Sequence, residues 1–226
     1  MKNLLLVGLG LLPAALFAQE DFTLSGKIAN VKPEAKVFIQ YQSSGQRVLD
    51  SAMVQNGAFK YQGSVVEQTQ AMLILSAEGQ SIAELRQSEV QPEVTSIYLA
   101  KGNLLLEGVD FKSSVVKGNA INEDFTRYKA GNKASEAEFA ALNAEYQAAT
   151  EAQQQDETFV TGLQKRAEAI YAKQNAANEA FVNANPNSYV SLSVLAELIN
   201  PENLTTVVKP AYESLAPALR NSSLGK

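Results

Sequence analysis

The sequence has 226 residues, of which 46% are hydrophobic and 19% are charged, and its formal net charge is −5. This balance is typical of one large or two small globular domains and excludes a disordered or fibrous chain. A nucleic-acid-binding protein needs a basic patch, and the longest basic cluster here is the pair Lys165-Arg166. We therefore expect no nucleic acid among the partners of this protein.

Residues 1–18 have the three-part pattern of a secretory signal peptide. Lys2 precedes an apolar run from Leu4 to Leu16, and small residues follow up to Ala18. The alternative is a membrane-spanning helix, but the run is shorter than the ~20 residues that a bilayer requires. No cysteine follows the run as a lipoprotein acylation site. We expect secretion across the inner membrane into the periplasm or cell envelope, without membrane insertion after cleavage.

Residues 19–118 are predicted to form an antiparallel β-sandwich domain. Its candidate strands are short, rich in Val, Ile, Tyr, Phe and Leu, and punctuated by Gly, Pro, Ser or Asn. They are residues 22–31, 35–42, 47–55, 58–66, 69–77, 95–100 and 103–109.

Asn56-Gly57 predicts a two-residue type I′ turn between two of these strands, because both residues tolerate a positive φ. The hairpin that follows sorts most apolar side chains to one face. Its register pairs Val54 with Phe59, Ala52 with Tyr61 and Val48 with Val65. Asp50 falls on the apolar face opposite Gly63. A catalytic carboxylate is one interpretation, and a bend or bulge with the carboxylate bonded to backbone N–H groups is the one we favour.

Residues 119–226 change to a helical period, which makes the fold class α+β. Asn119 to Tyr128 predicts a short helix, and Ser135 with Glu138 has the capping-box spacing of a second start. Apolar residues then recur at helical spacing in two stripes. They are Phe139, Leu142, Tyr146 and Ala149, and then Phe159, Leu163, Ile170, Ala177 and Phe181. Two helices with one narrow stripe each predict an antiparallel hairpin that stands partly clear of the sheet and mediates self-association as a homodimer.

Two Asn-Pro pairs, Asn185-Pro186 and Asn200-Pro201, divide the remaining chain. Ser188 is predicted to cap a helix that buries Leu192, Leu195 and Ile199. A last helix from about Leu204 to Leu215 carries Val207, Val208 and Tyr212.

The chain contains no histidine and no cysteine, which excludes most nucleophilic triads and zinc sites. A carboxylate pair could serve glycoside hydrolysis, but nothing in the sequence sets any two of Asp50, Glu107 and Asp110 at a working distance. Tyr41, Tyr61 and Tyr98 could line a sugar or peptide groove on the sheet, although aromatic residues in strands more often pack in a core or at an edge. We expect no catalytic residue, cofactor or metal.

The stretches FTLSGKI, DSAMVQNGAFKYQGSV, FVNANPNSYVSLSVL and YESLAPALRNSSLGK occur in this order. Together they resemble the N-terminal region of exported thioredoxin-like thiol-disulfide oxidoreductases of the TlpA/ResA type from Bacteroidetes, in the AhpC/TSA superfamily. The resemblance covers nearly all of residues 22–226. In that family a β-sandwich domain of unknown function and a helical segment precede a thioredoxin domain with a C-x-x-C pair.

The catalytic residues of that family lie in the thioredoxin domain, which this chain lacks, so none is assigned here. The chain is expected to be either a fragment or a stand-alone relative without the redox module. The resemblance implies a non-catalytic module that positions substrates for a thioredoxin-like domain or envelope protein. The alternative is a stand-alone envelope protein that binds a glycan or peptide through its tyrosines.

Overall fold

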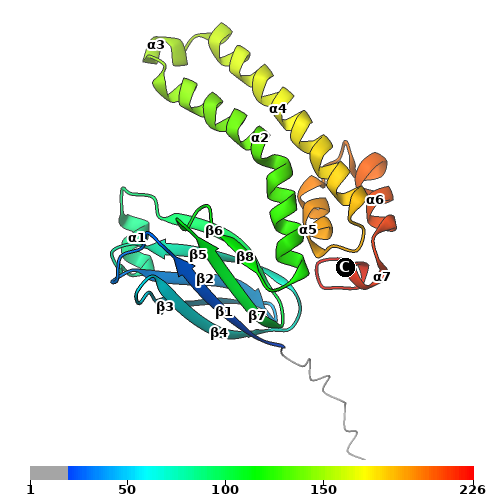
Figure 1. The fold of residues 1–226 in the computed structure, drawn as a ribbon. Coiled ribbons are helices and arrows are strands. Elements are labelled where there is room, and N and C mark those ends of the chain that lie inside the picture. The colour runs from blue at the N-terminus through cyan, green and yellow to red at the C-terminus, as the bar shows by residue number, and fades with distance from the viewer. Residues whose placement is uncertain (1–19) are drawn as a thin grey trace, which may run out of the picture.

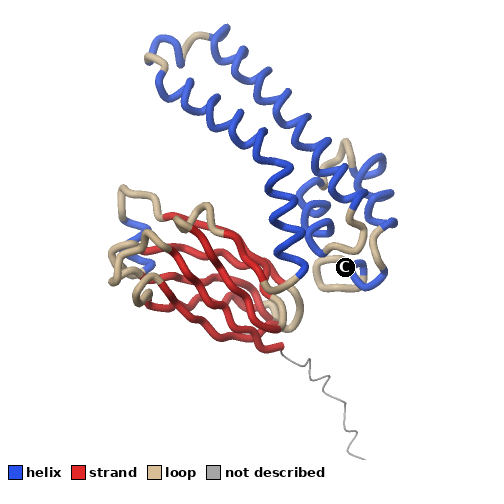
Figure 2. Tube along the Cα trace, in the orientation of Figure 1, coloured by secondary structure: helices blue, strands red, loops and turns tan. Residues whose placement is uncertain are grey.

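The computed structural model describes residues 20–226, so the predicted signal peptide lies outside the described part. Two sheets of four strands form a sandwich, and helices follow it, which confirms the α+β class (Figures 1 and 2). The first sheet has the order β4-β1-β7-β8, from Ala58–Val65, Glu20–Ile28, Gly102–Gly108 and Val115–Lys117. The second has the order β3-β2-β5-β6, from Gln46–Met53, Lys36–Ser43, Thr69–Ser76 and Glu93–Leu99.

One strand pair departs from the predicted antiparallel arrangement. β1 and β7 run parallel, with Leu24 beside Leu104, whereas the other paired strands are antiparallel. Parallel strands need a long connection between them. Here the connection from β1 to β7 contains the strands of the second sheet, and the chain then returns beside β1 in the same direction. Alternate residues of both sheets point inward and form one core, in which Leu24, Ile39, Leu73 and Leu106 are almost fully buried.

The Asn56-Gly57 turn forms as predicted, but the hairpin around it does not. Asn56 has φ 52° and Gly57 φ 73°, and Gln55 and Ala58 form a bridge across the turn. Beyond this bridge β3 pairs with β2, while β4 pairs with β1 in the other sheet. The predicted facing is still right for Val54, Phe59, Tyr61 and Val65, which are all buried. Alternation along each strand sets the facing, whichever strand is the partner.

Asp50 is exposed on β3, an edge strand of the second sheet, in regular register opposite Ile39. Its Oδ1 accepts the N–H of Ser51 at 2.7 Å, which confirms the predicted bond to the backbone. The predicted bulge is absent from this strand pair, and the expected place opposite Gly63 is wrong because β3 and β4 belong to different sheets.

Two small elements of the sandwich domain were not predicted. Strand β8 is three residues long, and helix α1 (Ile82–Gln87) lies between β5 and β6. A capping box starts α1, because the N–H of Glu84 donates to Ser81 Oγ and the N–H of Ser81 donates to a Glu84 carboxylate oxygen.

The helical region begins with α2 (Ala120–Ala148), which runs unbroken through the predicted second start. Ser135 is buried inside this helix, and Asn119 is the residue that caps it. After the short α3 (Glu151–Gln154), α4 (Glu157–Ala184) returns antiparallel to α2. The two long helices form the predicted hairpin, and its far end stands clear of the sandwich (Figure 1).

The remaining helices pack around the base of the hairpin (Figure 1). They are α5 (Tyr189–Leu198), a π-helical turn η1 (Leu204–Val208), α6 (Lys209–Ser214) and α7 (Pro217–Arg220). Ser188 caps α5 as predicted, and Leu192 and Leu195 are buried. Ile199 is 57% exposed, contrary to the prediction, because α5 ends at Leu198.

A polar layer divides the interior of the hairpin into two apolar parts. Toward the base, Val182 packs in the cluster that also covers the sheet, and toward the tip Leu142, Leu163 and Ile170 form a separate cluster. Between them lie Asn132, Ser135 and Asn178, all buried. The Nδ2 of Asn132 donates to Asn178 Oδ1 at 3.0 Å, while Asn132 Oδ1 has no partner among residues 20–226. Such a layer fixes the register of two helices at some cost in stability.

Replacing Leu163 with Ala is expected to lower the free energy of unfolding by about 2–5 kcal/mol, because the tip cluster loses a buried side chain. Lys165, two residues away, is exposed, and its replacement with Ala should change this free energy by less than about 0.5 kcal/mol. Urea unfolding of both variants measures the difference. Equal effects would contradict the facing of α4.

Replacing Asn132 with Leu is expected to cost about 1–3 kcal/mol, because Asn178 is then buried without its partner. Adding Asn178→Leu should recover most of this loss, since two apolar side chains that replace a buried polar pair can be neutral or stabilising. A double-mutant cycle by urea unfolding measures the coupling. Additive losses would show that the two amides do not act as a pair.

Candidate functional site

One asparagine fastens the helical region to the sandwich. The N–H of Tyr98 donates to Asn122 Oδ1 at 2.9 Å, and Asn122 Nδ2 donates to the carbonyl of Tyr98 at 2.7 Å. Tyr98 lies on β6, an edge strand, so the side-chain amide of Asn122 takes the place of a neighbouring peptide group. Asn119 Oδ1 accepts from Asn122 Nδ2 at 2.8 Å and thereby orients the amide. Asn122 is 2% exposed.

Aromatic rings surround this contact and form what we call the junction cluster, Tyr98, Phe125, Tyr128, Phe181 and Tyr189. The ring of Tyr98 meets Phe125 edge-on with centroids 5.1 Å apart, and meets Tyr189 edge-on at 6.0 Å. Tyr128 contacts Phe181 of α4 in the same way at 5.3 Å. The cluster joins β6, α2, α4 and α5, so the base of the hairpin is packed directly on the sheet.

Burial shifts the pKa values of several ionisable groups at the junction. It raises the pKa of both Tyr128 and Tyr189 to about 12, with smaller contributions from nearby acids. Burial also lowers the pKa of Lys129, whose ammonium lies 4.8 Å from the ring centroid of Phe125, and raises the pKa of Glu197. Both phenols stay protonated at neutral pH, so they can form hydrogen bonds but do not act as bases.

The three tyrosines singled out from the sequence do not share a surface. Tyr41 and Tyr61 point into the sandwich core, at 5% and 9% exposure, and Phe22 lies within 6 Å of both rings. Tyr98 is on the outer face of the second sheet, 2% exposed, and it packs against the helical region as a member of the junction cluster. Alternation along β2 and β4 turns the first two inward, and the helical region covers the third.

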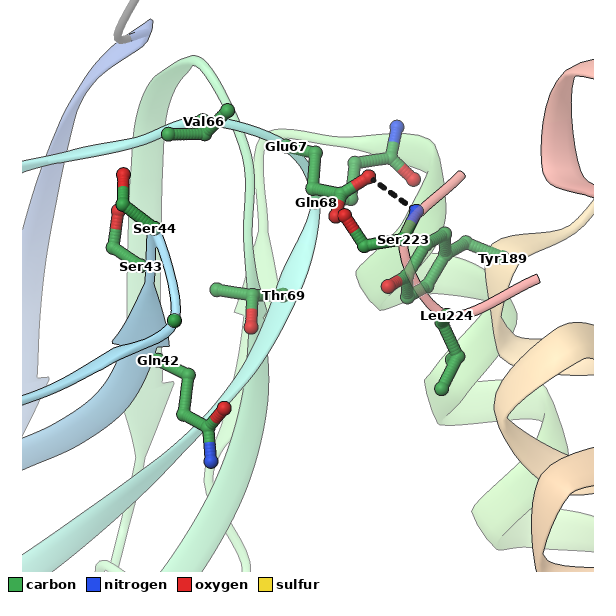
Figure 3. Close-up of a pocket in the computed structure, with 11 residues that line it drawn as sticks. Gln42, Ser43, Ser44, Val66, Glu67, Gln68, Thr69, Tyr189, Ser223 and Leu224 are labelled. Carbon is green, nitrogen blue, oxygen red and sulfur yellow. Dashed lines mark hydrogen bonds between the residues drawn. The ribbon is translucent and has the colours of Figure 1, made fainter. Parts of the chain in front are cut away.

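Beside the junction cluster lies an open cavity of about 450 Å³, here called the junction pocket (Figure 3). The sandwich supplies the β2–β3 and β4–β5 turns, and the helical region supplies the start of α5 and the C-terminal tail. The lining residues are Gln42, Ser43, Ser44, Gly45, Val66, Glu67, Gln68, Thr69, Tyr189, Ser223 and Leu224. Most of them are neutral hydrogen-bonding residues, as in a site that orients a polar ligand.

Two features hold the walls of the pocket in place. Glu67 Oε2 accepts the N–H of Ser223 at 3.2 Å, which ties the tail to the β4–β5 turn (Figure 3). On the other wall, Ser44 has φ 53° and Gly45 φ 72°, the two positive values of a type I′ turn between β2 and β3. Tyr189 was not among the predicted site residues, although its place directly after the capping Ser188 put it at the start of a helix.

The carboxylates considered for glycoside hydrolysis each have separate surroundings. Glu107 pairs with Lys117 at 2.9 Å, and Asp110 accepts the N–H of Ser113 at 2.7 Å, which lowers its pKa. Asp50 lies in the other sheet. Within residues 20–226, no cluster of acidic side chains is arranged to hold a metal ion. No helix in this part of the chain combines the length and apolarity of a membrane span.

Residues 22–125 match the model of a family described as a domain of unknown function (DUF4369). The match covers the sandwich and extends to Phe125, so it includes Asn122 and part of the junction cluster. No curated protein and no solved structure matches the chain. Residues 22–125 are thus a domain of this family, and its description names no activity.

Replacing Asn122 with Ala is expected to lower the free energy of unfolding by about 2–4 kcal/mol, because the N–H and C=O of Tyr98 lose their partners in a buried place. Asn122→Asp should also destabilise, since its second oxygen faces the Tyr98 carbonyl. Asn143→Ala, at an exposed position of the same helix, serves as the control. Urea unfolding with hydrogen exchange at the Tyr98 amide measures both effects, and unchanged exchange in Asn122→Ala would contradict the role of Asn122.

Proposed function

We propose that this chain is an exported, non-catalytic module of the cell envelope. Its junction pocket holds a polar segment of a partner and positions that partner for thiol–disulfide exchange by a thioredoxin-like domain. The observation that carries the proposal is the pocket itself, which the sandwich and the helical region line together. A ligand there contacts both parts at once, so the module holds it in a fixed orientation.

The chemistry of the chain supports binding rather than turnover. The sequence has no cysteine, so the electrons of a thiol–disulfide exchange have to come from another domain or protein. In the thioredoxin-like oxidoreductases that the sequence resembles, a separate domain carries the cysteine pair. The match at residues 22–125 is to a domain of unknown function, and its description names no partner.

The rigidity of the junction supports a positioning role. Asn122 clamps α2 to β6, and the junction cluster packs three helices on the same strand. Loops held by such a scaffold keep a bound segment in place at a lower entropic cost than mobile loops do.

A stand-alone envelope protein that binds a glycan or peptide is the second candidate. The amide and hydroxyl groups of Gln42, Gln68 and Thr69 favour it, because they suit sugar hydroxyls as well as peptide groups. Under this reading the binding site is again the junction pocket.

The purified chain is expected to show no insulin reduction with dithiothreitol. Added to a thioredoxin-like domain encoded in the same genome, it should lower the KM for a disulfide-containing protein substrate and leave kcat unchanged, because it supplies binding and not chemistry. Steady-state assays with and without the chain measure both constants. Turnover by the chain alone, or an unchanged KM, would overturn the proposal, and binding on a glycan array would then support the second candidate.

A further inference from the structure

We propose that the junction pocket receives a cationic side chain, a lysine ammonium or an arginine guanidinium, from a peptide segment of the partner. This inference rests on the proposed function, since it names the chemistry of the ligand that the same pocket holds.

The pocket carries an unbalanced negative group. Glu67 is the one acidic residue of the lining, and no lysine or arginine of the described chain lines the pocket. The Glu67 side chain is half-buried and forms no ion pair within residues 20–226. Its hydrogen bond from the Ser223 N–H uses one carboxylate oxygen and leaves the other for a ligand. A partly desolvated carboxylate without a counter-charge favours a cation.

An aromatic ring lies beside this carboxylate. Tyr189 lines the same cavity and lies near Glu67 (Figure 3). Its ring is fixed edge-on against Tyr98, and burial together with the charge of Glu67 holds its phenol protonated, with a pKa of about 12. An aromatic ring and a carboxylate line the same cavity, and these are the two kinds of group that attract an ammonium or guanidinium most strongly.

The remaining walls suit the donors of such a group. An ammonium carries three N–H donors and a guanidinium five, and neither accepts a hydrogen bond. Gln42, Gln68 and Thr69 offer amide and hydroxyl oxygens as acceptors around the cavity. A phosphate or carboxylate ligand would be repelled by Glu67, and a neutral sugar would leave that carboxylate without a counter-charge. Of these three ligand classes, a cation is the one that can interact favourably with the carboxylate, the ring and the hydrogen-bond acceptors of the pocket.

The test uses short peptides with blocked ends that carry a central lysine, arginine or Nε-acetyl-lysine, titrated into the purified chain by calorimetry. The lysine and arginine peptides are expected to bind about tenfold more tightly than the acetylated one, and less tightly as salt concentration rises. Glu67→Gln should reduce lysine-peptide binding by about tenfold, since it removes the charge but keeps an acceptor for Ser223. Glu197→Gln, the same change on α5 outside the lining, is the control and should alter binding less than twofold.

Circular dichroism of Glu67→Gln confirms that the variant is folded before its affinity is compared. Equal binding of the lysine and acetyl-lysine peptides, or unchanged binding by Glu67→Gln, overturns the cation assignment and leaves the positioning function standing. Failure of all the peptides to bind the natural chain overturns the cation assignment as well, and the enzyme assay with the thioredoxin-like domain then decides the positioning function by itself.

Discussion

The two hydrogen bonds between Asn122 and Tyr98 fix how the helical region sits on the sandwich. Because the side-chain amide occupies the free edge of β6, the first turn of α2 has one allowed position along that strand. Phe125, on the same helix, then lies over Tyr98, and this contact places the base of the hairpin against the sheet. The start of α5 meets the same ring, and the C-terminal tail reaches Glu67. Without this clamp the side of the junction pocket that the helical region supplies has no defined position relative to the sandwich.

The base and the tip of the hairpin differ in stability, because only the base lies close to the Asn122–Tyr98 contact. Its base shares a large apolar cluster with β6, α5 and α6, whereas its tip has a small cluster of its own beyond the buried Asn132–Asn178 pair. Ion pairs between Arg166 and Glu145 and between Lys173 and Glu138 join the exposed faces of the two helices, where such pairs contribute little. The tip is therefore expected to open at a lower free energy than the base.

The junction pocket combines features that suit recognition more than reaction. Its ring, carboxylate and amides come from segments far apart in the sequence, and burial keeps the phenol of Tyr189 in one protonation state at neutral pH. A binding site benefits from groups that do not change charge, whereas general acid–base catalysis needs groups that titrate near the working pH. The proposed cationic ligand would supply the counter-charge that Glu67 lacks within residues 20–226.

The sequence by itself determined the features that depend on near neighbours along the chain. Period-two alternation placed Phe59 and Val65 in the core, Asn56-Gly57 made its turn, Ser188 capped α5, and the apolar stripes built the hairpin. Only the tertiary structure decided which strand pairs with which, that β1 and β7 run parallel, and that α2 passes unbroken through Ser135. It also decided that Tyr98 is covered while Tyr189 reaches a pocket. The physical reason is that periodicity fixes which face of an element is apolar, whereas the partner that covers this face is selected by packing between distant segments.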